Sequence, residues 1–458
     1  MLPETVTEYL RVNRARHLAE LFELLRFPSV ANTEPEACRQ VADWLVERLR
    51  KLGLEARAVP TPGRPNVLAS LDVGDDVPTL LIYGHYDVQP PDPLERWDTR
   101  PFEPVVRDGA IYARGADDDK GQLYAHLMAI EALTRAGGGV PVNLRILLEG
   151  EEEIGSPNIE PFLAEHADEL SADAAVISDS EFFAEGLPSI TYSLRGLSYV
   201  EVTFRGPSVD IHSGLNGGAV TNPVNALARL VAGMHDSNGR VTLPGFYDDV
   251  LDLTDAERTQ WEALPFDEAE YAQSLGVKAL GGGESDFSVL ERRWARPTLD
   301  ANGIVGGYTG FGSKTIIPAE ASAKISMRLV ANQDPDKIVE GFRQYVADNT
   351  PPGIRAEVQL NAGARPVMVP PQSPAMEAGK AAMAEAFGNE AAMTRCGASV
   401  PITELFQRLL GLDVVLMGFG LPGDNLHSPN EHYRLEQFYG GAVASAAMMC
   451  NIGRFLAK

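Results

Sequence analysis

Histidine and acidic residues follow four apolar segments of this sequence, each with the length and composition of a buried β-strand. The segments are 79–83, 142–148, 174–178 and 414–419. The polar residues that come after them are His85 and Asp87, the run from Glu149 to Glu153, Asp179 and, beyond a loop with Gly and Pro, His427. Imidazoles and carboxylates bind divalent metal ions and transfer protons in hydrolysis. Because ligands gather beyond the carboxyl ends of strands in an open α/β sheet, we expect the four groups to share one site.

Two acidic clusters have more than one interpretation. Asp117, Asp118 and Asp119 directly precede a helical segment, so they are acids at a helix N-terminus, residues of a solvated loop, or ligands of a cation. A calcium loop would alternate Asp with other residues, and this cluster does not. The glutamates at 149–153 are either an acid-rich surface turn or a catalytic pair. In such a pair one carboxylate binds a metal ion and its neighbour takes a proton from the attacking water.

The overall composition excludes several classes of protein. Of the 458 residues, 44% are hydrophobic and 22% are charged, which is typical of a globular chain and not of a disordered one. The formal net charge of −25 repels phosphates, so we expect neither nucleic acid nor a membrane as a partner. The three cysteines are widely spaced, and the sequence has neither a signal-peptide pattern nor an apolar run that could span a bilayer. These features together predict a cytoplasmic protein.

The elements that must position the polar residues have an α/β pattern. In 1–194 and 365–458, short apolar segments alternate with helical ones, which predicts a catalytic domain with a mainly parallel sheet flanked by helices. The first 60 residues have a helical pattern. Within them the segment 35–53 ends at Gly53, which is a typical helix stop.

A different pattern occupies residues 195–364. The order strand, helix, strand, strand, helix, strand predicts a compact α+β domain inserted into the first one. Its expected elements include strands at 198–204, 324–329 and 355–360, helices at 222–234 and 336–347, and an acidic, partly helical excursion at 245–297.

Eight motifs are more specific together than any single residue. In chain order they are 84–90 (GHYDVQP), 114–121 (RGADDDKG), 149–156 (EGEEEIGS), 177–179 (ISD), 210–214 (DIHSG), 314–318 (KTIIP), 326–330 (SMRLV) and 427–431 (HSPNE). They resemble the M20 metallopeptidase family, and within it the carnosinase and cytosolic non-specific dipeptidase branch, over almost the whole chain. The resemblance implies a hydrolase that cleaves the amide bond of dipeptides. It also implies that the inserted domain is a lid through which the protein forms a homodimer.

The resemblance further implies a site with two divalent metal ions. The implied ligands are His85 and Asp179 for one ion, Glu153 and His427 for the other, and Asp118 as the bridge between them. A cis peptide bond between Asp118 and Asp119 is implied as well. Imidazole and carboxylate ligands suit zinc, and they also admit manganese or cobalt. Asp87 would orient His85, and Glu152 would be the general base for a hydroxide that bridges the metal ions.

In the inserted domain the resemblance implies substrate contacts. His212 resembles a histidine that reaches across the dimer to the oxyanion of the tetrahedral intermediate, and Thr315 resembles its companion from the same lid. Arg328 resembles the residue that binds the terminal carboxylate of the substrate, which a guanidinium can grip through two hydrogen bonds. Ser399 matches a further family contact to that carboxylate.

Substrate preference is open at this stage. Where the family commonly has glutamate and glycine in Arg-Glu-Gly-Gly-Ser-Ile-Pro, this chain has Cys396 and Ala398. The same site would hydrolyse any amide next to a carboxylate, so an N-acyl-amino-acid deacylase is the nearest alternative function. A non-catalytic protein that binds metal or peptide is another, although Glu152 and all the implied ligands are present. The preferred side chains and the choice between α- and β-linked dipeptides do not follow from the sequence.

Overall fold

The computed structural model of the protein describes residues 2–398 and 400–456. The chain divides into two compact units, one of Met1–Tyr192, Val369–Thr394 and Pro401–Lys458, and the other of Ser193–Met368 and Arg395–Val400. The last of these segments falls in the range 365–458 that the sequence assigns to the catalytic domain. It groups with the second unit because Arg395 forms an ion pair with Glu257, and because Nε of Arg195 donates to the carbonyl oxygen of Gly397 at 3.0 Å.

The largest sheet has parallel strands at its centre. In spatial order its strands are β1 (Glu55–Val59), β2 (Asn66–Leu71), β6 (Asn143–Glu149), β3 (Thr79–His85), β7 (Ala174–Ile177), β17 (Val414–Leu416), β8 (Ser189–Leu194) and β15 (Val367–Met368), and β16 (Ala392–Cys396) also pairs with β8. β3 pairs in parallel with both β6 and β7, and β17 pairs in parallel with β7. The predicted mainly parallel sheet is confirmed. The carboxyl ends of these four strands therefore lie at one edge.

One element near the N-terminus differs from the prediction. Residues 55–59 form β1 and not part of a helix, because exposed Glu55 and Arg57 alternate with buried Ala56 and the strand pairs antiparallel with β2. A period of two is the pattern of a strand with one covered face. The helix before it, α3 (Pro35–Lys51), ends as predicted ahead of Gly53, whose φ of 94° favours glycine.

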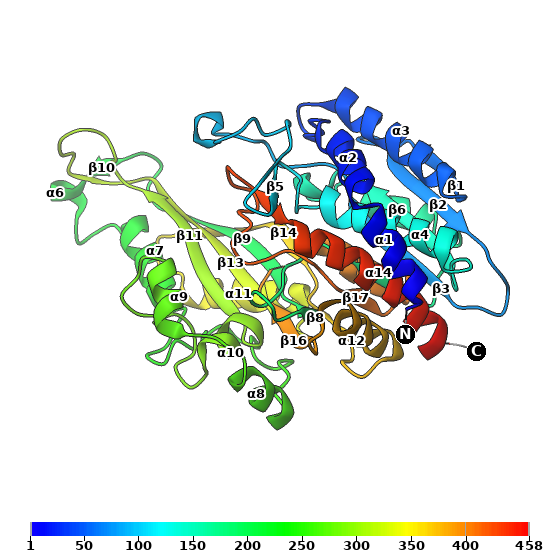
Figure 1. Ribbon diagram of the computed structural model, residues 1–458. Coiled ribbons are helices and arrows are strands. Elements are labelled where there is room, and N and C mark those ends of the chain that lie inside the picture. The colour runs from blue at the N-terminus through cyan, green and yellow to red at the C-terminus, as the bar shows by residue number, and fades with distance from the viewer. Residues whose placement is uncertain (1, 399, 457–458) are drawn as a thin grey trace. The chain divides into compact units, whose positions relative to one another are not determined.

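Helices cover the sheet of the first unit. They are α1 (Glu4–Val12), α2 (Arg14–Leu25), α3, α4 (Lys120–Ala136), α5 (Ile159–Glu165), α12 (Pro374–Phe387), α13 (Pro401–Leu410) and α14 (Leu435–Phe455). α4 is buried all round from Lys120 to Leu133, and α14 packs along it and along α12 (Figure 1). Gly441 of α14 lets the helix approach the ring of Phe419, because a Cβ atom there would lie 2.6 Å from that ring. Within the described ranges no helix is both long and apolar enough to cross a bilayer.

A small antiparallel sheet joins segments that are far apart in the sequence. Its strands are β18 (His432–Arg434), β5 (Ala110–Tyr112) and β4 (Val105–Arg107), and short helical turns occur at η1 (Leu94–Arg96) and η2 (Glu152–Ile154). Tyr433 pairs opposite Ile111. This pairing brings the end of the 427–431 motif next to the start of the 114–121 motif.

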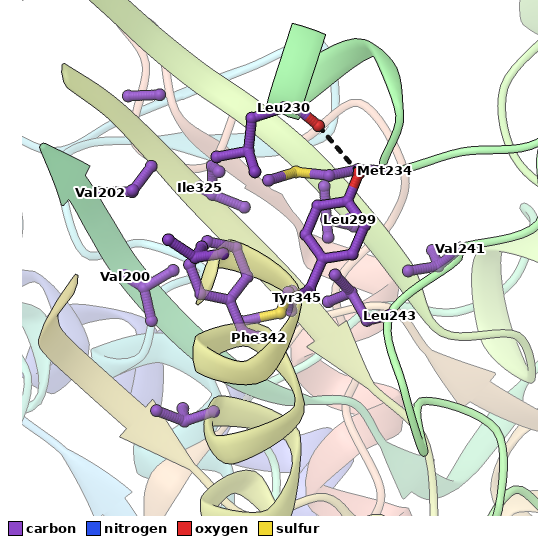
Figure 2. Packing of buried hydrophobic residues seen from close by; sticks show 14 of the residues in the cluster. Val200, Val202, Leu230, Met234, Val241, Leu243, Leu299, Ile325, Phe342 and Tyr345 are labelled. Carbon is purple, nitrogen blue, oxygen red and sulfur yellow. Dashed lines mark hydrogen bonds between the residues drawn. The ribbon is translucent and has the colours of Figure 1, made fainter. Parts of the chain in front are cut away.

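The second unit is an α+β domain around a four-stranded antiparallel sheet. Its strands are, in order, β11 (Thr298–Gly306), β13 (Glu320–Leu329), β9 (Gly196–Arg205) and β14 (Arg355–Ala364). Helices α7 (Pro223–Ala232) and α11 (Pro335–Asn349) pack on it, and their side chains meet those of the strands in one core (Figure 2). Within that core the hydroxyl of Tyr345 donates to the carbonyl oxygen of Leu230 at 3.1 Å. The predicted order of strands and helices is confirmed.

Shorter elements complete the second unit. The excursion at 245–297 contains α8 (Asp255–Glu262), α9 (Glu268–Ser274) and α10 (Val289–Trp294). Two short strands, β10 (Ile211–His212) and β12 (Ile316–Ile317), pair antiparallel in a separate sheet. The helices α6 (Ser213–Asn216) to α10 and the strand β11 lie between them in the sequence.

Candidate active site

Five predicted ligand residues come together in the first unit. Two groups each place one ligand atom per residue within 4.8 Å of the others: His85, Asp118 and Asp179 form one, and Asp118, Glu153 and His427 form the other. Asp118 belongs to both groups. Its Oδ1 lies 3.0 Å from Nε2 of His85, and its Oδ2 lies 2.8 Å from Nε2 of His427. The two oxygens of one carboxylate thus face two imidazoles.

The strand ends position most of these side chains. His85 is the last residue of β3, Asp179 follows β7 by two residues, and Glu153 lies in the turn η2 after β6. Asp118 precedes α4, and the peptide bond between it and Asp119 is cis, as the resemblance implies. His427 lies on the loop between β17 and β18. The parallel sheet therefore delivers side chains from distant parts of the sequence to one edge.

The arrangement of His85 fits a bound cation. Its Nδ1 lies 3.1 Å from the carbonyl oxygen of Asp87 and donates to it, which leaves Nε2 as the nitrogen that faces the carboxylates. Nε2 is buried and makes no hydrogen bond in the described part of the chain, although carboxylate oxygens of Asp118 and Asp179 lie 3.0 and 3.8 Å away. An imidazole lone pair and carboxylates that face one another repel unless a proton or a metal ion lies between them. These donors therefore fit a divalent metal ion.

In the second ligand group, carboxylates also surround an imidazole, that of His427. Contacts with Asp118 and then with Glu153 raise the pKa of His427 to about 10, which reflects the negative potential of the carboxylates around it. Oε2 of Glu153 lies 3.3 Å from Nε2 of His427. One imidazole and two carboxylates again form a donor set of the kind that zinc, manganese and cobalt accept.

Asp87 connects the two halves of the centre. Its side chain is fully buried, and its two carboxylate oxygens accept hydrogen bonds from the backbone N–H groups of Glu152 at 3.2 Å and Glu153 at 3.1 Å. Oδ1 also lies 3.5 Å from Nδ1 of His85. Asp87 thus contacts the imidazole as the sequence predicts. It also holds the glutamate turn, which the sequence does not indicate.

Glu152 and Glu153 are adjacent in the sequence but differ in their surroundings. The carboxylate of Glu153 belongs to a candidate ligand group, whereas that of Glu152 belongs to neither of the two groups. Burial raises the pKa of Glu152 to about 8, with His85 opposing the shift and the charges of Asp179 and Glu153 adding to it. A carboxyl group near the ligands, with a pKa close to neutrality, has the properties of a general base.

Three residues of the site were not predicted from the sequence. Gln89 holds the carboxylate of Glu153, because its backbone N–H donates to Oε1 at 3.1 Å and its Nε2 donates to Oε2 at 2.7 Å. Arg114 and Glu431 form a buried ion pair beside Asp118. All three lie inside motifs that the resemblance uses, and no pattern of spacing distinguishes them from their neighbours.

The residues predicted to contact the substrate lie in the second unit. β10 and β12 bring His212 next to the segment of Thr315, where the N–H of Ser213 donates to the carbonyl oxygen of Thr315 at 3.1 Å. Both side chains are exposed. The backbone N–H of Gly214 donates to Nδ1 of His212 at 3.0 Å, so the neutral ring carries its proton on Nε2.

Arg328 is half-buried on β13, and a second guanidinium, that of Arg195, lies close to it. Burial lowers the pKa of Arg195 to about 10, and the positive charge of Arg328 adds to this effect. Cys396, whose position carries glutamate in the family, is half-exposed and accepts a hydrogen bond from the N–H of Ala398 at 3.3 Å. The predicted contact Ser399 lies outside the described residues.

Known proteins resemble this chain along most of its length. Residues 81–451 match the model of peptidase family M20/M25/M40. The chain is 32% identical to Cys-Gly metallodipeptidase DUG1 of Candida albicans over 93% of each chain, and 31% identical to the Beta-Ala-His dipeptidase of Homo sapiens over 87% of this chain and 79% of the other. A solved structure, the M20 family metallo-carboxypeptidase Sso-CP2 from Sulfolobus solfataricus, matches with a TM-score of 0.84 and 35% identity, covering 96% of this chain and 99% of that one. The family inferred from the eight motifs is thus confirmed. The chain belongs to peptidase family M20/M25/M40, and it is a metallopeptidase of the M20 type.

Proposed function

We propose that the enzyme is a dipeptidase that works with two divalent metal ions, for which zinc suits the donors and manganese and cobalt are alternatives. The observation that carries the proposal is the pair of ligand groups that share Asp118, with the carboxyl of Glu152 nearby but in neither group. The names of two relatives, a Cys-Gly metallodipeptidase and a Beta-Ala-His dipeptidase, support a dipeptide as the substrate.

The roles of the side chains follow from their positions. His85 and Asp179 would hold one ion, Glu153 and His427 the other, and Asp118 both. When bound, the ions acidify the attacking water and polarise the carbonyl of the scissile bond.

Side chains of the protein carry out the proton transfer. Glu152 takes the proton from the attacking water and gives it to the leaving amine. Asp87 fixes both His85 and the backbone of Glu152, so the base keeps its position relative to the ligands.

Substrates longer or shorter than a dipeptide are the second candidates. The Sulfolobus relative is a metallo-carboxypeptidase, which favours larger peptides with a free terminal carboxylate, and N-acyl amino acids offer the same amide and carboxylate. A panel of α- and β-linked dipeptides, tripeptides and N-acetyl amino acids separates these functions. We expect the highest kcat/KM for dipeptides, and a preference for N-acetyl amino acids would establish a deacylase instead.

Metal removal tests the proposed chemistry on the same substrates. Dialysis against a chelator should abolish hydrolysis, and zinc, manganese or cobalt should restore it, because the groups that the described residues bring together are metal ligands with a base beside them. Elemental analysis of the dialysed protein is the control. Full activity in protein shown to be metal-free would contradict the mechanism.

We also propose that the second unit is the lid and the surface through which a homodimer forms. Its edge strand β11 leaves Ile304 and Val305 exposed by 57% and 68%, and α6 leaves Leu215 exposed by 82%. Apolar side chains on an unpaired edge are typical of a surface that another chain covers. The neutral ring of His212, with its proton on Nε2, is suited to donate a hydrogen bond to an oxyanion in the partner's site.

Arg328 should act on the substrate and not on the metal. We expect Arg328→Ala to reduce kcat/KM on substrates with a free terminal carboxylate by about 10²-fold, since a charge-assisted bidentate contact contributes roughly 3 kcal/mol, and to change hydrolysis of their amides little. Lys324→Ala is the matched control, because Lys324 is a cation on the same face of β13. Equal losses on acid and amide substrates would mean that Arg328 only stabilises the second unit.

A further inference from the structure

The carboxylate of Glu431 makes four hydrogen bonds with one turn of the chain. Oε2 accepts from Nη1 of Arg114 at 2.6 Å and from the backbone N–H of Gly115 at 3.0 Å. Oε1 accepts from the backbone N–H groups of Asp117 at 3.1 Å and Asp118 at 3.2 Å. Both Glu431 and Arg114 are buried to 1% exposure or less. Several N–H groups of one turn that converge on a single anion fix the conformation of the backbone that carries them.

The same pair also holds the loop of His427. Nη2 of Arg114 donates to the carbonyl oxygen of Ser428 at 3.4 Å, and the carbonyl oxygen of Glu431 accepts from the N–H of Ala113 at 3.2 Å. Within this loop His427 has a φ of 58°, a left-handed conformation that a side chain with a Cβ adopts unfavourably. The side chain of His427 is 55% exposed, so packing contributes little to its position. The loop therefore depends on contacts at its end.

The two groups of candidate ligands differ in which part of the fold holds them in position. His85 and Asp179 lie at the ends of two adjacent parallel strands, and His85 is fully buried. Their separation is set by the sheet. His427 and Asp118, in contrast, lie on two loops that meet through Glu431 and the short sheet of β18 and β5.

We infer that Glu431 is a positioning residue, which connects the Asp118 turn to the His427 loop and so sets the affinity of the ion held by Asp118, Glu153 and His427. The inference rests on the proposed two-ion function. Glu431 belongs to neither group of candidate ligands. It acts through the backbone of Asp118 and through the loop that carries His427.

Metal titration of the metal-free protein tests this role without an activity assay. Glu431→Gln keeps the shape of the side chain, but its amide NH₂ would face donors that need an acceptor. Loss of a residue that orients metal ligands typically weakens metal binding by about 10 to 100-fold. In competition with a chromogenic chelator, we expect that loss for the zinc equivalent held by Asp118, Glu153 and His427, and a smaller loss for the other equivalent, which shares Asp118. The absorption of cobalt in the weakened equivalent should change in parallel.

Glu131→Gln is the matched control. Glu131 is a buried carboxylate on α4 that pairs with Arg16 and Arg48, and it belongs to neither ligand group. Both variants should unfold at lower temperature than the wild type, yet Glu131→Gln should bind both zinc equivalents normally. If Glu431→Gln does not fold, Glu431→Asp replaces it, because the shorter side chain keeps the charge and withdraws the oxygens from the turn.

The outcomes separate the inference from the function on which it rests. Wild-type affinity for both ions in the Glu431 variants, or an equal loss for both ions, would overturn the positioning role. A similar loss in Glu131→Gln would show general loosening of the unit and would overturn it too. Fewer than two tight ions in the wild-type protein would instead contradict the proposed two-ion function, independently of any variant.

Discussion

Glu152→Gln should retain its metal ions and lose a factor of about 10² to 10⁴ in kcat, the usual contribution of a positioned general base. The amide keeps the size of the side chain but cannot accept a proton from the attacking water. Its KM should change little, because Glu152 belongs to neither ligand group and its proposed work lies in proton transfer. Steady-state kinetics with zinc-loaded protein, together with elemental analysis, measures both effects.

Glu153→Gln is the control for this experiment, since it makes the same chemical change one residue further along. Its carboxylate lies 3.3 Å from Nε2 of His427 and is held by Gln89, so the substitution should weaken binding of one ion. We therefore expect Glu152→Gln to lose proton transfer and Glu153→Gln to lose affinity for one metal ion. If metal content falls in Glu152→Gln and stays intact in Glu153→Gln, the roles of the two glutamates are exchanged.

Two inactive variants should restore activity when their subunits mix. His212→Ala lacks the group that we propose each subunit lends to its partner, and Glu152→Ala lacks its own base. In a mixed dimer, the site on the His212→Ala subunit keeps Glu152 and receives an intact His212 from the other subunit. Random exchange makes about half of the dimers mixed, each with one complete site of two, so roughly a quarter of wild-type activity should return.

Refolding the two variants together and assaying hydrolysis measures the recovery directly. Each variant refolded alone is the baseline, and mass spectrometry of differently tagged subunits confirms that mixed dimers exist. Absence of recovery in a sample with confirmed mixed dimers would mean that His212 serves its own subunit or has no part in catalysis.

Much of the fold could be predicted because its local signals agree with its tertiary contacts. β3, β6 and β7 are rich in apolar residues and almost entirely buried, as expected of strands covered on both faces, and α3 has a clear stop at Gly53. β1 was missed because its alternation extends over only five residues, two of them the charged Glu55 and Arg57, so pairing with β2 determines its conformation. The strand predicted at 414–419 ends at Leu416, and the next N–H, that of Met417, donates to the carbonyl oxygen of Ile177.

The candidate ligands could be named because their motifs resemble those of the family, whereas their supporting contacts could not. Glu431 and Asp118 are hundreds of residues apart, and only the folded chain brings the carboxylate to the N–H of the turn. Gln89 has no feature in the sequence that marks it as a partner of Glu153. The place of Arg395 in the second unit likewise depends on its ion pair with Glu257, a contact between distant segments.

The division of the first unit into three stretches of chain has a consequence for biosynthesis. β17 lies between β7 and β8, and α14 packs against α4, so the last 60 or so residues complete both the sheet and the interior of that unit. They are also the stretch that contains His427. At a translation rate of about 5 to 20 residues per second, the continuous stretch from Ser193 to Met368 leaves the ribosome several seconds before them and can fold first. The first unit, although its synthesis starts earlier, must wait for its C-terminal segment. The complete set of candidate metal ligands is therefore assembled only after the stretch that contains His427 has been synthesised.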